Sequence, residues 1–161
     1  MTAKPNMTAQ TTLHHKRTFA APREKVFRAW TDPEALKRWW GPGECSTSIA
    51  EVDLRVGGKY RLGMQCQGDG GIFFLNGVYR EILPPERLVY TWRWESPDMD
   101  AGETLVTVEF HDHGQTTEIV LIHENFPRPE ISEQHHQGWL GCFDSLAEML
   151  ERGDNGQTTI S

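Results

Sequence analysis

Hydrophobic and polar residues alternate along much of the chain between residues 45 and 124. The pattern is clearest over 88–95, where a leucine, a tyrosine and two tryptophans take every second position, with arginine and glutamate among the residues between them. A period of two is typical of a strand with one buried face. Segments of this kind, separated by turn signals, predict strands over 45–54, 58–66, 72–83, 87–95, 104–111 and 116–124. Connections this short allow only antiparallel pairing.

A helical period appears on either side of this region. After a further strand predicted over 13–20, Pro22 suits the first position of a short helix, and Asp32 suits the cap of a second one that ends near Gly41. The longest predicted helix covers 132–152, with Gly153 as its C-terminal cap. Its apolar residues form one stripe at helical spacing: Trp139, Cys142, Phe143, Leu146, Met149 and Leu150.

This order of elements predicts an α+β domain. A curved sheet of seven antiparallel strands, completed by 13–20, would wrap around the long C-terminal helix and cover its apolar stripe, with the two short helices after the first strand. We expect one domain over 13–152, a disordered N-terminal tail over 1–12 and a flexible C-terminal tail over 153–161. Both ends are polar and lack a periodic pattern.

Composition argues against several classes of function. Among 161 residues, 16 Lys and Arg against 23 Asp and Glu give a net charge of −7, which is unfavourable for binding nucleic acid or an anionic membrane. No apolar run is long enough to span a bilayer, and the first residues lack the apolar centre of a signal peptide. We therefore expect no membrane insertion and a cytoplasmic location. Three widely separated cysteines predict free thiols, with neither a disulfide nor a structural metal site.

Five local motifs span nearly all of the predicted domain. They are APREKVFRAWTDPE at 21–34, WWGP at 39–42, DLRVGGKYR at 53–61, PPERLVYTW at 84–92 and GW at 138–139. Together they resemble the family related to the activator of heat-shock-protein-90 ATPase, within the START and birch-pollen-allergen (SRPBCC) superfamily. The resemblance implies the helix-grip fold, and a cavity between the sheet and the long helix that suits a small apolar molecule. The fold hosts lipid carriers, hormone receptors, polyketide cyclases and co-chaperones.

Six tryptophans and seven phenylalanines are many for a chain of modest hydrophobicity. Each one alone is better explained as core, but a single helix fills a gripping sheet incompletely, so we predict that some of them line a ligand pocket. The candidate ligand-binding residues are Trp39, Trp40, Phe73, Tyr90, Trp92, Trp94, Phe110, His123, Trp139 and Phe143. His123 matches a histidine common at this position in the family. We interpret it first as a hydrogen-bonded histidine at a strand end, and alternatively as a polar ligand anchor or an acid–base group.

The other histidine pairs do not predict a metal site. His111 and His113 flank the tip of a predicted hairpin, where a turn is the simpler interpretation and no third ligand is evident. His135 and His136 are adjacent in the long helix and point about 100° apart, so we interpret them as a solvated pair, although His135 could face the mouth of the pocket. The chain contains no nucleophile-elbow, zinc-protease or phosphate-loop motif.

The leading functional hypothesis is a non-enzymatic carrier or sensor that binds a small hydrophobic molecule. A cavity enzyme of the cyclase, dehydratase or hydrolase type, using His123, is the first alternative. A co-chaperone-like interaction module is the second. The co-chaperone of the family carries an additional domain ahead of this one, whereas about a dozen residues precede the first strand here, so we do not expect chaperone binding. We expect no cofactor, no metal and no nucleic-acid partner, and the sequence leaves a homodimer open.

Overall fold

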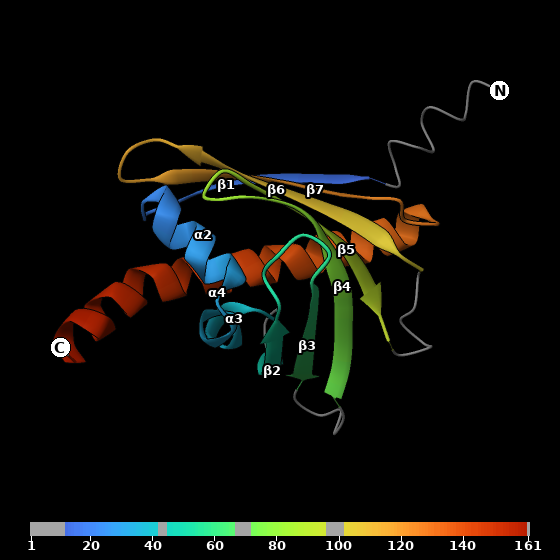
Figure 1. The fold of residues 1–161 in the computed structure, drawn as a ribbon, viewed down its shortest axis with the longest axis horizontal. Coiled ribbons are helices and arrows are strands. Elements are labelled where there is room, and N and C mark those ends of the chain that lie inside the picture. Colours follow the sequence, from blue (N-terminus) through green and yellow to red (C-terminus); the bar gives the residue numbers. More distant parts are fainter. Residues whose placement is uncertain (1–11, 42–44, 67–71, 96–101, 161) are drawn as a thin grey trace.

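A seven-stranded antiparallel sheet forms the frame of the molecule (Figure 1). The computed structural model describes residues 12–41, 45–66, 72–95 and 102–160, with side chains up to residue 151. Its sheet order is β1-β7-β6-β5-β4-β3-β2. The strands are β1 (Leu13–Phe19), β2 (Cys45–Val52), β3 (Lys59–Cys66), β4 (Ile72–Leu83), β5 (Arg87–Trp94), β6 (Thr104–Asp112) and β7 (Thr117–Glu124). The helices are α2 (Arg23–Thr31), α3 (Pro33–Trp39) and α4 (Pro129–Ile160). The predicted α+β architecture is confirmed.

The sheet is curved, and α4 runs along its concave side with α2 and α3 beside it (Figure 1). Register shifts interrupt two of the strand pairs, between Thr47 and Ile49 in β2 and between Tyr79 and Glu81 in β4. A bulge of this kind bends the strand that carries it and increases its twist. These two irregularities therefore help the β2–β4 side of the sheet to bend around the helices.

The core lies between β5 and the apolar stripe of α4. On β5, Leu88, Tyr90, Trp92 and Trp94 are all buried, whereas Arg93 and Glu95 are exposed on the other face. Phe143 and Leu146 of α4 are completely buried. Burying a side chain of this size contributes about 1.5–3 kcal/mol, so the contact between sheet and helix is a main source of stability. The predicted contact between the two faces is confirmed for Trp92 and Trp139, whose ring centroids lie 5.2 Å apart, whereas Phe143 packs on Phe19 of β1.

The long helix extends beyond its predicted bounds at both ends. It begins at Pro129, which fits because proline is tolerated in the first turn, where its missing N–H has no helical partner. It continues to Ile160, so the prediction that Gly153 ends it is wrong. A glycine costs a helix about 1 kcal/mol without breaking it, and no proline follows to stop the helix. The predicted N-terminal tail, apart from Thr12, lies outside the described residues.

The prediction of free thiols is wrong for Cys45, which is disulfide-bonded. Cys142 is free and buried. Spacing along the chain does not reveal a disulfide, because the bond depends on which residues the fold brings together. Within the described residues, no helix is long and apolar enough to cross a membrane.

Candidate functional site

A small cavity lies between the helices α2–α3 and the strands β3–β5. Its volume is about 20 Å³, which is enough for one water molecule. The residues that line it are Trp30, Leu36, Trp40, Tyr60, Leu62, Leu75, Tyr79, Tyr90 and Trp92. Three of these, Trp40, Tyr90 and Trp92, are among the predicted ligand-binding residues. This part of the interior, between α2–α3 and β3–β5, is therefore almost filled by aromatic side chains.

Three tyrosines from three adjacent strands form one wall of the cavity. The ring centroid of Tyr60 lies 5.6 Å from that of Tyr79 and 5.3 Å from that of Tyr90. Tyr60 Oη donates to the carbonyl of Thr91 at 2.6 Å, and Tyr90 Oη accepts from Trp30 Nε1 at 3.2 Å. Burial raises the pKa of all three phenols, so they stay neutral at physiological pH. The wall therefore presents aromatic faces and hydroxyl groups, but no charge.

A glycine allows this wall to close. A Cβ at Gly77 would overlap the Thr91 carbonyl oxygen and would lie 2.5 Å from Cε2 of Tyr60. Any side chain at this position would therefore displace β5 or the Tyr60 ring from its place.

Trp92 connects the cavity with the centre of the core. Its ring centroid lies 5.9 Å from that of Trp40, 5.2 Å from that of Trp139 and 4.9 Å from that of His123. The residue is only 5% exposed, and its indole N–H has no hydrogen-bond partner in the described part of the chain. A buried donor without an acceptor costs about 1–3 kcal/mol. Trp92 therefore brings an unused hydrogen-bond donor to a residue of the cavity wall.

His123 is completely buried at the end of β7, and both of its ring nitrogens have partners inside the protein. Trp139 Nε1 donates to Nδ1 at 3.1 Å, so the proton of the ring is on Nε2. This nitrogen then donates to Thr104 Oγ1 at 2.8 Å, and the Thr104 hydroxyl donates to the Trp92 carbonyl at 3.0 Å. Burial holds the pKa of His123 well below its usual value. The geometry is that of a neutral, hydrogen-bonded structural histidine, and it gives no support to an acid–base role.

His135, like His123, has a hydrogen-bond partner on each ring nitrogen, so its interpretation as a solvated side chain is wrong. Trp94 Nε1 donates to Nε2 at 3.0 Å, and Nδ1 therefore donates to the carbonyl of Ile131 at 2.9 Å. The His135 and His123 rings lie 5.5 Å apart. Burial also lowers the pKa of His135. Helix periodicity did not indicate this partner, because Trp94 is on a distant strand.

The remaining predicted site residues are divided over the core. Seven of the predicted residues do not line the cavity: Trp39, Phe73, Trp94, Phe110, His123, Trp139 and Phe143. Three of these seven, Trp94, His123 and Trp139, contact the ring of Trp92. Trp39 donates to the Ala29 carbonyl at 2.8 Å, and Phe110 packs on Phe27 at a centroid distance of 5.2 Å. The lining residues that the sequence analysis missed are Trp30, Leu36, Tyr60, Leu62, Leu75 and Tyr79. The alternation of Tyr60 and Leu62 on β3 was the one local signal for this wall.

No cluster of three or more metal-ligating side chains occurs among the residues that the structure describes. At the hairpin between β6 and β7, Asp112 Oδ1 accepts from the backbone N–H of Gly114 at 2.9 Å, and Gly114 has φ of +85°. His111 Nε2 lies 3.1 Å from Glu109 Oε1 on the strand itself. This geometry agrees with the interpretation of the segment as a turn.

A family model described as Activator of Hsp90 ATPase homolog 1-like protein matches residues 20–151. The chain belongs to this family. No curated protein matches it. Among solved structures, a protein of Chromobacterium violaceum has 29% identity and a TM-score of 0.80, covering 88% of this chain and 97% of its own. A protein of Nitrosomonas europaea has 28% identity and a TM-score of 0.77, covering 91% and 98%. A Silicibacter pomeroyi protein named AHSA1 has 26% identity and a TM-score of 0.78, covering 88% and 99%. The helix-grip architecture is thus shared over almost the whole length of these chains.

Proposed function

We propose that this member of the family binds a small hydrophobic molecule between α2–α3 and strands β3–β5, without catalysing a reaction on it. The observation that carries the proposal is the indole N–H of Trp92, which is buried without a partner in a residue that lines the aromatic cavity. Protein interiors rarely leave a donor in this state unless a water or a ligand satisfies it.

The lining selects the chemistry of the ligand. No ionised side chain lines the cavity among the described residues, so a charged molecule would lose its hydration without compensation. Six aromatic side chains favour a flat, aromatic partner. Trp92 then adds one donor, which matches a single acceptor such as a carbonyl oxygen. The ligand class is therefore a small neutral aromatic molecule that carries one hydrogen-bond acceptor.

Space is the limiting factor for such a ligand. Benzene needs a cavity of roughly 150 Å³, and the cavity here measures about 20 Å³. Binding therefore requires side chains of the lining, or the seven-residue helix α3, to move apart from β3 and β4. Leu75, which is completely buried in the cavity wall, is the side chain whose shortening would provide space directly.

A pair of leucine variants tests the site. Leu75→Ala enlarges the cavity, whereas Leu121→Ala removes the same group from an equally buried position on β7 that does not line it. Both variants lose stability by about 2–5 kcal/mol, which urea unfolding measures. Only Leu75→Ala should gain affinity for acetophenone in calorimetric titrations. If it is too unstable to purify, Leu75→Val provides a smaller gain of space.

Ethylbenzene, which has nearly the same shape without the acceptor, is the matched probe. A hydrogen bond of about 1 kcal/mol predicts roughly fivefold weaker binding of ethylbenzene. The indole N–H resonance of Trp92 should shift with acetophenone alone in heteronuclear NMR spectra. Equal affinities of the two leucine variants for acetophenone would overturn the proposed location of the site. Binding of both probes with equal affinity would overturn the role of Trp92.

A further inference from the structure

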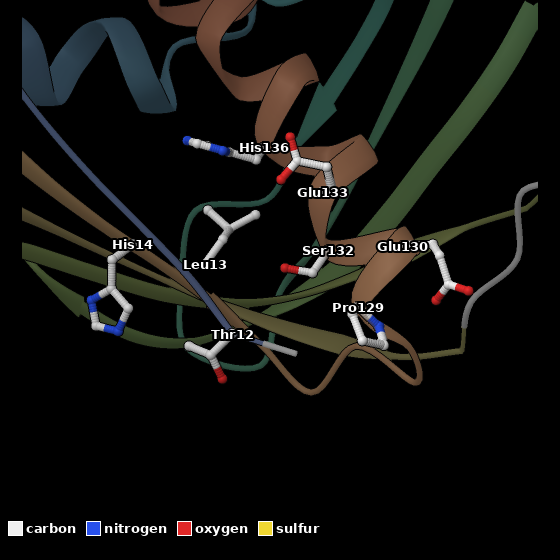
Figure 2. Close-up of a pocket in the computed structure, with 8 residues that line it drawn as sticks. All are labelled: Thr12, Leu13, His14, Pro129, Glu130, Ser132, Glu133 and His136. Carbon is white, nitrogen blue, oxygen red and sulfur yellow. The ribbon is translucent and has the colours of Figure 1, made fainter. Parts of the chain in front are cut away.

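A second pocket, larger and open to solvent, lies between the start of β1 and the first turns of α4 (Figure 2). Its volume is about 600 Å³, within the range of small-molecule sites. It shares no lining residue with the aromatic cavity, and it does not depend on the function proposed for that cavity. Its lining is amphipathic, because Leu13 and Pro129 supply apolar surface and most of the other residues are polar.

The charged groups of this pocket are negative. Glu130 and Glu133 line it on the α4 side, and no lysine or arginine is among the described lining residues. Glu133 accepts a hydrogen bond from Gln137 Nε2 at 2.9 Å, and neither carboxylate has an ion-pair partner in the described structure. The N-terminus of a helix carries about half a positive charge, which two carboxylates exceed. With the two lining histidines, His14 and His136, counted as neutral, the pocket has a net negative charge and attracts cations.

The hydroxyl group of a buried serine points into the same space. Ser132 is only 5% exposed, and Figure 2 shows its hydroxyl directed from α4 into the pocket. Among the residues that the structure describes, its side chain has no hydrogen-bond partner, so the hydroxyl is available to a donor in the pocket. The Ser132 hydroxyl is thus an acceptor for a cationic donor, beside the carboxylates. Leu13, which is 6% exposed, provides the apolar surface next to it.

We propose that this pocket binds a small organic ammonium ion with a short hydrocarbon chain. The ammonium group donates to the Ser132 hydroxyl and to the Glu133 carboxylate, and the hydrocarbon lies on Leu13 and Pro129. Figure 2 shows the Glu130 carboxylate directed away from these groups, so Glu130 contributes its charge from a longer distance. A bare metal ion fits less well, because no group of three metal-ligating side chains occurs in the described ranges.

Isothermal titration calorimetry of the full chain with 1,4-diaminobutane tests this proposal. The matched ligand is 1,4-butanediol, which has the same length and no charge. The double variant Glu130→Gln/Glu133→Gln removes both carboxylates, and Glu151→Gln is the control, because it makes the same change at an exposed position of α4 outside the pocket. Ser132→Ala removes the hydroxyl, and circular dichroism confirms that each variant is folded.

The diamine should bind to wild type and to Glu151→Gln with equal affinity, and at least tenfold more weakly to the double variant. Ser132→Ala should weaken binding severalfold, and the diol should not bind measurably. Equal affinities of the double variant and Glu151→Gln would overturn the site, because the attraction would then be non-specific. Binding of the diol as tightly as the diamine would overturn the ligand class. If the double variant fails to fold, the single variant Glu133→Gln and the Ser132→Ala titration decide in the same way.

Discussion

Two buried neutral histidines make the stability of this domain dependent on pH. His123 and His135 each accept an indole N–H on one ring nitrogen, so protonating either ring in the folded chain breaks a hydrogen bond as well as burying a charge. Burial holds the pKa of both below the usual value, most strongly for His123. In the unfolded chain both rings titrate near the ordinary value of about 6.5. The unfolded state therefore binds more protons below this pH, and acid favours unfolding.

The size of the effect follows from the linkage between proton binding and folding. Each proton taken up on unfolding lowers the free energy of unfolding by about 1.4 kcal/mol per pH unit. Between pH 7.5 and pH 5.0, one histidine that stays neutral in the folded state costs about 2 kcal/mol. His123 should contribute this amount and His135 less, because its burial is less complete. The contribution of each neutral ring to the free energy of unfolding is fully present above about pH 6.5. It decreases as the pH falls, until the lowered pKa of the folded ring is reached.

Urea unfolding at several pH values between 7.5 and 5.0, followed by tryptophan fluorescence, measures this dependence. His135→Gln removes one titrating ring while leaving an amide oxygen to accept from Trp94, so its slope should be shallower than that of wild type. His113→Gln, at the exposed hairpin, leaves the buried pair intact, so the part of the slope that comes from His123 and His135 should remain. Imidazole nitrogen resonances should show that His123 keeps its proton on Nε2 down to pH 5.

Two results would refute the reasoning. One is a free energy of unfolding that is the same at pH 5.0 and pH 7.5, because the folded and unfolded chains would then bind equal numbers of protons. The other is a His123 ring that titrates near pH 6.5 in the folded protein, which would mean that water reaches it.

Three further predictions concern packing and thiols. Gly77→Ala should lower the free energy of unfolding in urea by about 3 kcal/mol, because its Cβ would overlap the Thr91 carbonyl. Gly138→Ala, which has open space in α4, should raise the free energy of unfolding by about 0.5–1 kcal/mol. Equal effects of the two substitutions would contradict this reasoning. Thr104→Val leaves His123 Nε2–H without an acceptor and should cost about 1–3 kcal/mol in the same assay; an unchanged midpoint would refute the hydrogen-bond chain. Burial raises the pKa of the Cys142 thiol to about 12, so a disulfide reagent at pH 8 should label it only after unfolding; fast labelling of the native chain would exclude its burial.

Secondary structure and face assignment were largely readable from the sequence. The alternation over 88–95 placed Trp92 and Trp94 on the buried face of β5, and the stripe of α4 identified Phe143 and Leu146 as core. These properties are local, because a period of two or of 3.6 residues depends only on neighbouring positions. With seven antiparallel strands and one long apolar helix, few arrangements could bury every apolar face, so the fold class followed. The end of α4 did not follow, because Gly153 weakens a helix without ending it.

The contents of the site were decided by tertiary structure alone. Periodicity showed that Trp92 faces inward, but its neighbours His123 and Trp139 come from β7 and α4. Hydrogen-bond partners depend on strand register and helix position, and the disulfide of Cys45 likewise depends on which residue the fold brings beside it. The space left for a ligand is a small difference between the volume that the sheet and helices enclose and the volume of the side chains inside. Such a difference is set by packing in three dimensions, and no pattern along the chain encodes it.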